Sequence, residues 1–490
     1  MRHLRLVGLA LVLLLVASAC GQKQGVALSA GGPTGAAGAG ATVDDGTGGL
    51  TAADPSLTDP AADPAAGAEA APTDAGTAAP AGGGAPAASG PAPAGGGPAT
   101  TARPAAGGGS AAPAGGAPAA SAPTTGPNDK VGIGDKEIVI GIHAPVTGAA
   151  PFPQATFEEG REVYWKAKGP IHGRTVKVVF FDDQFNPSRA VQVCREMVEK
   201  NKVFLLVGGG GADQITACAK YANQVGVPYL SAGVNQTGLE GLKTYFALSL
   251  TYSQQSPIIA QLVKNKLGKT KIGIVVADTP SFADAQASFT KAAQEAGLEI
   301  VRNAKINKSA SASETLAEAG AQQRAGAEAV YILTSPTVFI QFAQSAANQG
   351  FNPQYVGPGI TAGLNTVANV GCPGIGEARF LSPFFQLDDP AAQEYKDAYQ
   401  KQNGKAGDDI GFALWGLSAV LGEMFNATGP DIGRGKFMAT LQSGRAFSGG
   451  VYPEVKYAPG KPFGGSAMAL LKADCGGRRY ITEAKNVTGF

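Results

Sequence analysis

The sequence EIVIGIHAPVTGAAPF, residues 137–152, indicates how the folded part of the chain is organised. Its β-branched, apolar start, IVIGI, predicts a strand that is buried on both faces, as in a parallel sheet. The segment over residues 143–148 is rich in turn residues and leads to a helical pattern that begins near Gln154. In an open parallel sheet, ligands bind in the loops that leave the carboxyl ends of strands. The first folded element therefore ends in a candidate binding loop.

Downstream of this loop, strand patterns alternate with helical patterns. Such alternation is typical of parallel sheets with right-handed crossovers, and its occurrence in two successive runs favours two similar α/β lobes over one large sheet. From residue 449 onward the pattern indicates short strands and turns. Strands are predicted over residues 175–181, 203–207, 228–231, 271–276, 299–306, 329–333 and 354–356, and helices over residues 154–168, 187–200, 213–225, 253–267, 282–296, 313–323, 337–349, 391–402 and 410–427.

The first 20 residues have the organisation of an export signal. Arg2 and Arg5 precede an apolar core over residues 6–16, which is too short to remain as a membrane-spanning helix. Small residues then lead to Cys20, and this arrangement resembles a bacterial lipoprotein signal peptide. The resemblance implies cleavage before Cys20, lipidation of Cys20, and anchoring at the outer face of the bacterial cell membrane. Ordinary secretion with a free Cys20 is the alternative.

Residues 21–130 predict a disordered tether. Ala, Gly, Pro, Thr and Ser dominate this segment, which contains no aromatic residue. Such a composition cannot bury enough apolar surface to offset the entropy lost on ordering. A flexible chain of about 110 residues has a mean span of roughly 55 to 60 Å, which would let an anchored domain explore a shell beside the membrane. A glycosylated or cell-wall-interacting stalk is the alternative.

Composition and motifs exclude several functions for the remaining segment, residues 131–490, which is long enough for two domains. The chain has 39 basic and 38 acidic residues and no basic stripe with interleaved aromatic residues, so no nucleic-acid partner is predicted. No apolar run of about 18 residues follows the signal, so no transmembrane helix is predicted. The motifs GxxxxGK[ST], GxSxG and HExxH are absent, so neither an enzyme nor a cofactor is predicted.

The segments IGIHAPVTG, HGRTVKVVFFDDQFNPSRA and VPYLSAG, in this order and spacing, resemble the type I periplasmic binding proteins. The most similar branch is the leucine/isoleucine/valine-binding type that serves ABC importers, and the resemblance covers residues 135–490. It implies an α/β fold with two Rossmann-like lobes of parallel sheets, joined by three crossover strands, which close on a ligand by a hinge. By this analogy, lobe I comprises residues 135–250 and 377–448, and lobe II comprises residues 251–376 and 449–490.

Four cysteines remain besides Cys20, and an even number in an exported chain favours disulfides. Three pairings are possible. The lobe assignment implied by the resemblance favours Cys194–Cys218 within lobe I and Cys372–Cys475 within lobe II. A metal site is the alternative, but the chain has no CxxC pair and only three His residues, so no metal is predicted.

The resemblance also implies a ligand site. In the family, the loops after the first, third and fourth strands of lobe I hold the ligand's carboxylate, and they correspond to residues 146–152, 209–213 and 231–235. A lobe II aromatic residue closes over the ligand and matches Phe282, whereas the family's acidic partner for an α-ammonium falls at residues 335–338, where this chain has no carboxylate. The expected ligand-contacting residues are Phe152, Gly210, Gly211, Ala212, Asp213, Ser231, Gly233, Asn235, Phe282, Ser335, Thr337 and Thr361.

Several of these residues have structural alternatives. The glycines at 208–211 could present backbone N–H groups to an anion such as a carboxylate, or form a tight turn that touches no ligand. Asp213 could supply a negative charge to the ligand, but its place at the start of a helix favours N-capping. Phe152 and Phe282 could pack in a core. Asp182 and Asp183 are expected to orient their loop rather than to form an acid/base pair.

Together these features predict a lipid-anchored solute-binding protein of an ABC importer. It would capture a small amino-acid-like or carboxylate-bearing solute by hinge closure and present it to a membrane permease. The missing lobe II carboxylate argues against a plain amino acid, because an unpaired ammonium in a closed cleft is costly. A ligand-sensing lipoprotein of the same fold, which signals to a membrane partner, and an exported α/β enzyme are the alternatives.

Overall fold

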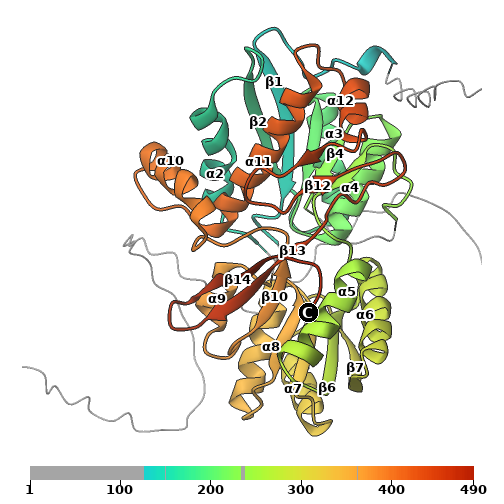
Figure 1. Ribbon diagram of the computed structural model, residues 1–490, viewed down its shortest axis with the longest axis vertical. Helices are drawn as coiled ribbons and strands as arrows, with labels where there is room; N and C mark the ends of the chain where they lie inside the picture. Colours follow the sequence, from blue (N-terminus) through green and yellow to red (C-terminus); the bar gives the residue numbers. More distant parts are fainter. Residues whose placement is uncertain (1–125, 149–150, 233–237, 361) are drawn as a thin grey trace, which may run out of the picture. The chain divides into compact units, whose positions relative to one another are not determined.

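The computed structural model describes residues 126–148, 151–232, 238–360 and 362–490. These residues form two α/β parts, one built on a five-stranded sheet and the other on a seven-stranded sheet (Figure 1). We call the first lobe I and the second lobe II. The predicted fold class, with two Rossmann-like lobes and mainly parallel sheets, is confirmed.

The sheet of lobe I has the strand order β2-β1-β3-β4-β5, and all of its strands are parallel. Its strands are β1 (Glu137–Ala144), β2 (Thr175–Asp182), β3 (Leu205–Gly208), β4 (Tyr229–Ser231) and β5 (Tyr245–Ala247). Its helices are η1 (Gly126–Asn128), α2 (Gln154–Lys168), α3 (Pro187–Glu199), α4 (Ala212–Gln224), η4 (Pro390–Ala392), α10 (Gln393–Asn403), α11 (Asp409–Thr428) and α12 (Arg434–Leu441).

Strand β1 lies between β2 and β3 in the sheet of lobe I, and seven of its eight residues are buried. Ile138 and Ile142 pack in one core with residues of α2 and α11, whereas Val139 packs in another with residues of α3 and α4. At Gly141, a Cβ would lie 2.6 Å from Met197 Sδ. The glycine in this strand therefore allows α3 to pack closely against the sheet.

Helix α11 is the core helix of lobe I. Among the described residues, it alone is long and apolar enough to cross a membrane by length and composition, with a mean hydropathy of 1.3. An apolar stretch of this length after the signal was not predicted from the sequence. However, 78% of this stretch is buried inside the protein, where it packs against α2, so its composition is that of a core helix.

The sheet of lobe II has the order β14-β13-β10-β9-β8-β6-β7, in which β13 and β14 are antiparallel to their neighbours. Its strands are β6 (Lys271–Ala277), β7 (Glu299–Ile306), β8 (Ala329–Leu333), β9 (Gln354–Pro358), β10 (Arg379–Ser382), β13 (Met468–Asp474) and β14 (Arg479–Val487). Its helices are α5 (Tyr252–Gln261), η2 (Leu262–Lys266), η3 (Pro280–Phe282), α6 (Ala283–Glu295), α7 (Ala312–Arg324), α8 (Pro336–Asn348) and α9 (Asn365–Gly371).

Two expected lobe boundaries differ from the observed sheet pairing. Strand β10, expected in lobe I, pairs with β9 and β13 of lobe II. Residues 449–464, expected in lobe II, stay beside lobe I, because Ala247 N donates to Pro462 O (2.8 Å) and Gly464 N donates to Ala247 O (3.0 Å). The small antiparallel sheet of β11 (Ala446–Phe447) and β12 (Val455–Lys456) flanks this segment. The chain therefore passes between the lobes after β5, after β10 and before β13.

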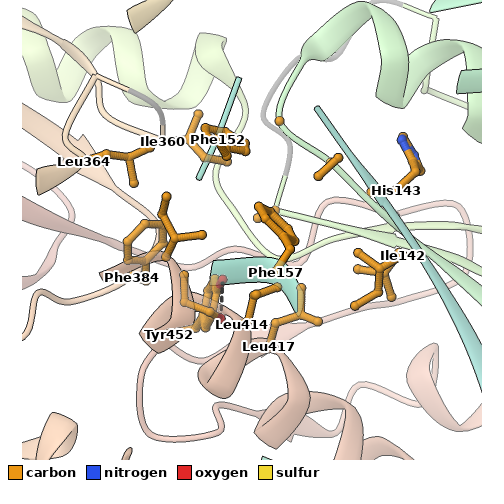
Figure 2. Close-up of a pocket in the computed structure, with 18 residues that line it drawn as sticks. Ile142, His143, Phe152, Phe157, Ile360, Leu364, Phe384, Leu414, Leu417 and Tyr452 are labelled. Atoms are coloured by element: carbon orange, nitrogen blue, oxygen red, sulfur yellow. Dashed lines mark hydrogen bonds between the residues drawn. The ribbon is translucent and has the colours of Figure 1, made fainter. Parts of the chain in front are cut away.

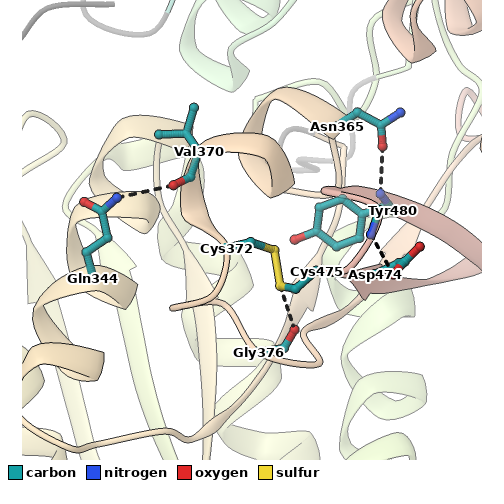
Figure 3. The surroundings of a disulfide bond; sticks show 9 residues. Gln344, Asn365, Val370, Cys372, Gly376, Asp474, Cys475 and Tyr480 are labelled. Carbon is teal, nitrogen blue, oxygen red and sulfur yellow. Dashed lines mark hydrogen bonds between the residues drawn. A yellow bond between two sulfur atoms is a disulfide. The ribbon is translucent and has the colours of Figure 1, made fainter. Parts of the chain in front are cut away.

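Both predicted disulfides are present. Cys194–Cys218 joins α3 to α4 with a Cα–Cα distance of 6.0 Å, and Cys372–Cys475 joins the end of α9 to the turn after β13 with a distance of 5.4 Å. Figure 3 shows the second bond beside the hydrogen bond from Tyr480 N to Asn365 Oδ1. Each bond lies within one lobe, so neither ties the two lobes together.

Replacing Cys372 and Cys475 by Ala is expected to lower the free energy of unfolding by about 3 to 5 kcal/mol, because the bond joins residues 103 positions apart and its loss restores the entropy of the unfolded chain. Urea unfolding under oxidising conditions, followed by circular dichroism, measures the change. Reduction of the unmodified protein is the matched comparison, since it opens both bonds. A loss below about 1 kcal/mol would contradict this prediction.

Candidate functional site

A cleft lined by residues of both lobes lies at the ends of parallel strands. On the lobe I side, it begins just after β3, which ends at Gly208, and on the lobe II side just after β6 and β8, which end at Ala277 and Leu333. The carboxyl ends of strands are where open α/β sheets bind ligands. The lobe I lining is Phe185, Gly210, Gly211, Ala212, Asp213 and Gln214, and the lobe II lining is Tyr252, Ala277, Thr279, Phe282, Lys308, Leu333, Thr334, Ser335, Pro336 and Ile360.

The glycines at the end of β3 and before α4 have no room for side chains. A Cβ at Gly208 would lie 1.5 Å from Tyr229 Oη, and one at Gly210 would lie 2.3 Å from Phe152 Cε2. Gly211 is the N-cap of α4 and supplies no side-chain hydrogen bond. The first-turn N–H groups of α4 therefore have no side-chain cap, and a helix start of this kind favours an anion.

A buried polar network packs against two of these glycines, Gly208 and Gly209. His143 Nδ1 lies 2.7 Å from Asp183 Oδ2, and His143 Nε2 lies 2.7 Å from Tyr229 Oη. Because the carboxylate accepts, we assign the proton to Nδ1, so that Nε2 accepts from the tyrosine hydroxyl. Burial raises the pKa of Tyr229 well above its usual value, which keeps the hydroxyl protonated as the donor. The network fixes the two rings against which Gly208 and Gly209 pack.

The same region contains the one described grouping of residues with metal-ligating atoms, namely His143, Cys194 and Cys218. The two sulfur atoms are joined in a disulfide, and both nitrogens of His143 are hydrogen-bonded. To bind a metal, these three residues would have to offer thiolates and a free imidazole nitrogen. This grouping does not fit a metal ion.

Asp182 contacts the loop that follows it, as expected, and also the loop after β1, which was not expected. Its carboxylate accepts hydrogen bonds from Val146 N (3.0 Å), from Gln184 N (2.9 Å) and from Thr147 Oγ1. Burial alone would raise the pKa of Asp182, but these hydrogen bonds outweigh it and hold the pKa below its usual value. The ionised carboxylate therefore ties the β1 loop to the end of β2.

Asp213 connects the two lobes across the cleft. It lies in the first turn of α4 and not at the N-cap, which is Gly211, so the N-capping interpretation was wrong. Gly211 has extended dihedral angles, and the helix begins only after it. The Asp213 carboxylate instead accepts a hydrogen bond from Ser281 Oγ of lobe II.

The structure brings only part of the expected residues together. Gly210, Gly211, Ala212, Asp213, Phe282 and Ser335 line the cleft, and Phe152 lines a neighbouring pocket. Ser231 is buried at the end of β4 and Thr337 is exposed on α8, and neither lines the cleft. Ser335 caps α8, since its Oγ accepts from Val338 N at 3.4 Å. Gly233, Asn235, Thr361 and Cys20 lie outside the described residues.

Several residues of the cleft were not predicted from the sequence, among them Phe185, Tyr252, Thr279 and Lys308. Thr279 Oγ1 is buried and has no hydrogen-bond partner in the described part of the chain. Lys308 is exposed at the edge of the cleft. Phe185, Thr279 and Lys308 each follow closely after a predicted strand, so the rule that ligands bind at strand ends could have found them if it had been applied to every strand.

A second pocket, which we call the apolar chamber, lies beside the cleft. Its walls come from β1, β3, α2, α11 and Tyr452 of lobe I, from Phe384 on the segment that leaves β10, and from Ile360 and Leu364 of lobe II (Figure 2). It holds about 620 Å³ of space not filled by protein atoms, open solvent at its mouth included. Its lining is almost entirely apolar, as is typical of small-molecule sites.

Asp409 is a buried ionisable group at the contact between the lobes. It lies at the start of α11 and accepts a hydrogen bond at Oδ2 from Asn365 N of α9 (2.8 Å). Burial raises the pKa of Asp409 to about 7, although the hydrogen bond from Asn365 opposes the shift. The folded protein thus keeps a proton that the unfolded chain releases near the ordinary Asp value of 3.8.

This difference predicts a pH-dependent stability. The contribution of Asp409 to the free energy of unfolding is largest below about pH 4. It decreases as the pH rises toward about 7, because the folded state binds more protons than the unfolded state in this range. Asp409→Asn keeps the acceptor for Asn365 N–H but cannot ionise. Melting temperatures at about pH 5 and about pH 8 should therefore differ less for this variant than for the unmodified protein. Asp397→Asn, at an exposed site on α10, is the matched control; equal pH dependence in all three proteins would refute the assignment.

Comparison with known proteins places this chain among binding proteins. The sequence profile of a family described as periplasmic binding protein matches residues 137–478. An amino acid binding protein of Pseudomonas aeruginosa is 26% identical over 171 residues, which cover 32% of this chain and 43% of that protein, so the match spans less than half of that relative.

Two solved structures share the fold at low sequence identity. The first is a branched-chain amino acid ABC transporter protein from Thermus thermophilus with bound valine, with a TM-score of 0.62 at 16% identity, covering 73% of this chain and 98% of that chain. The second is a fatty acid ABC transporter substrate-binding protein from Thermomonospora curvata, with a TM-score of 0.63 at 18% identity, covering 73% of this chain and 94% of that chain. Both show the same two-lobed α/β architecture.

Proposed function

The chain belongs to the periplasmic binding protein family, and we propose that it captures a small solute between its lobes and delivers it to the membrane permease of an ABC importer. The resemblance to the type I members, read from the sequence, is confirmed by the family match and by the fold. The observation that carries the proposal is the cleft, which is lined by strand-end residues of both lobes.

The mechanism that we propose is population shift and involves no covalent step. A solute in the cleft contacts the start of α4 in lobe I and Thr279, Phe282 and Lys308 in lobe II. It makes both sets of contacts only when the lobes are together. Because a ligand stabilises the state that it binds more tightly, the solute favours the closed arrangement, which the permease then recognises.

The charges of the cleft support a carboxylate-bearing solute. The start of α4 and the Lys308 ammonium both favour an anion. Asp213 is the one acidic residue in the described lining, and its carboxylate also accepts a hydrogen bond from Ser281 of lobe II. The similar solved structures are named for valine and for fatty acids, both of which carry a carboxylate.

We also propose that the binding domain is exported and tethered. The signal-like first 20 residues support lipidation at Cys20 and anchoring at the outer face of the cell membrane. The low-complexity segment over residues 21–130 supports a long flexible connection to the binding domain. Labelling cells with a radioactive fatty acid, with Cys20→Ser as the control, tests the anchor. Label retained by the Cys20→Ser protein would contradict it.

The proposal predicts a role for Thr279. Replacing Thr279 by Val removes a buried hydroxyl that has no partner in the described protein, so solute affinity should fall about tenfold, as for one lost hydrogen bond. Thr337→Val is the matched control, because Thr337 is exposed outside the cleft. Isothermal titration calorimetry with the bound solute measures both variants. Equal affinities for the two variants would contradict the assignment of Thr279.

The function itself is tested by native mass spectrometry of the exported protein, followed by a thermal-shift screen. The panel should contain amino acids, short-chain and long-chain carboxylic acids, amides and aromatic carboxylates. We expect a co-purified small molecule, or one compound class that raises the melting temperature by mass action. If nothing binds over the whole panel, solute capture would be refuted in favour of a sensing or structural role.

A further inference from the structure

The apolar chamber and the cleft adjoin each other, because Gly210 and Ile360 line both of them. We propose that the solute is an amphipathic monocarboxylate, whose carboxylate lies in the cleft and whose hydrocarbon tail fills the apolar chamber. This inference rests on the proposed function and specifies the class of solute that the cleft takes.

The chemistry of the chamber walls selects a hydrocarbon. Among its described lining residues, only His143 and Tyr452 carry polar side-chain atoms. Both nitrogens of His143 are occupied by Asp183 and Tyr229, and the Tyr452 hydroxyl donates to Ala413 O at 3.2 Å. A polar group that entered the chamber would find no free side-chain partner there. It would lose its hydration without compensation, whereas an apolar tail would gain from burial.

The packing of lobe I explains why the chamber exists. Phe157 of α2 and the buried Leu414 and Leu417 of α11 form its wall, as Figure 2 shows. Between them the lining includes the small residue Ala413, which is only partly buried although it lies in the core helix. Apolar walls that face solvent are stabilised when an apolar group covers them. A tail that fills this space replaces the missing packing.

At the boundary between the chamber and the cleft, Gly210 has no side chain, which allows Phe152 and Pro145 to approach it closely. Gly210 stands next to the Phe152 ring, where a Cβ would meet Cε2 at 2.3 Å and the Pro145 ring at 2.9 Å. Any larger residue at this position would therefore displace the Phe152 ring, which is itself part of the chamber wall. The glycine lets this ring stand at the boundary between the chamber and the cleft.

The position of the chamber couples tail binding to the arrangement of the lobes. Ile360 and Leu364 come from lobe II, Tyr452 lies beside α11 of lobe I, and Phe384 lies on the segment that leaves β10. A tail in the chamber therefore contacts both lobes and one connecting segment. Since each added methylene buries more apolar surface against both lobes, longer tails should favour the closed arrangement more strongly.

The carboxylate is assigned to the cleft by the groups that face it. Lys308 supplies the positive charge in the described lining, and Thr279 Oγ1 supplies an unpaired hydroxyl. The uncapped start of α4 lies on the opposite side, in lobe I. These groups line the cleft, which shares Gly210 and Ile360 with the apolar chamber, so the proposed solute places its head in the cleft and its tail in the chamber.

The test is calorimetric titration of the full exported chain with straight-chain carboxylic acids of increasing length. The panel also includes phenyl-substituted acids, the matched fatty alcohols, and valine. Affinity for the acids should rise about three- to fourfold per methylene until the chamber is full, and then level off. The phenyl-substituted acids show whether an aryl tail replaces an alkyl tail. An alcohol that binds as tightly as its acid would overturn the assignment of the head group.

Three variants locate the two ends of the solute. Ala413→Leu places added carbon in the chamber and should weaken long acids at least tenfold, while the shortest acid binds as before, which also shows that the variant is folded. Ala427→Leu, on the same helix but outside the chamber, should leave every affinity unchanged. Lys308→Gln should weaken the acids about tenfold and the alcohols little.

The possible failures are distinguishable. If affinity does not depend on tail length, or if Ala413→Leu and Ala427→Leu behave alike, the tail assignment is wrong, although solute capture stands. Binding of valine without binding of any acid in the series would likewise refute the tail assignment and leave solute capture intact. If neither the acids nor valine nor any co-purified molecule binds, the proposed function itself fails.

Discussion

The burial of β1 on both faces is the constraint on which the rest of the structure depends. Pairing with β2 on one side and β3 on the other brings the ends of these strands to one edge of the sheet. There His143, the next-to-last residue of β1, joins Asp183 after β2 to Tyr229 of β4. The rings held by this network leave no room for side chains at Gly208 and Gly209, so the strand that organises the fold also shapes the binding edge.

Two different spaces meet at this edge, and their chemistry is complementary. The cleft carries a cation, an unpaired hydroxyl and an uncapped helix start, whereas the polar side chains of the apolar chamber are already engaged within the protein. A polar site gives orientation, and an apolar site gives affinity that grows with buried area. Because residues of both lobes line both spaces, a ligand that fills them is bound most tightly when the lobes are together.

Features that depend on local pattern could be predicted from the sequence, and features that depend on distant packing could not. The alternation of strands and helices indicated the two lobes, and the family resemblance implied both disulfides. Strand β10 was assigned to the wrong lobe because its partners lie far away in sequence, as do the partners of residues 462–464. The apolar chamber was missed for the same reason. Phe157 and Leu414 face it from helices that are more than 200 residues apart, and no local signal marks a space between two apolar helices.

The most direct test of solute capture is a crystal structure of the protein grown with the tightest-binding acid of the series. We predict continuous ligand density that begins near Lys308 and the start of α4, passes Gly210 and Ile360, and ends between Phe157 and Leu414. Density in this position would establish both the binding function and the class of solute. An empty cleft and chamber in crystals grown at saturating solute, or density elsewhere on the protein, would contradict the account.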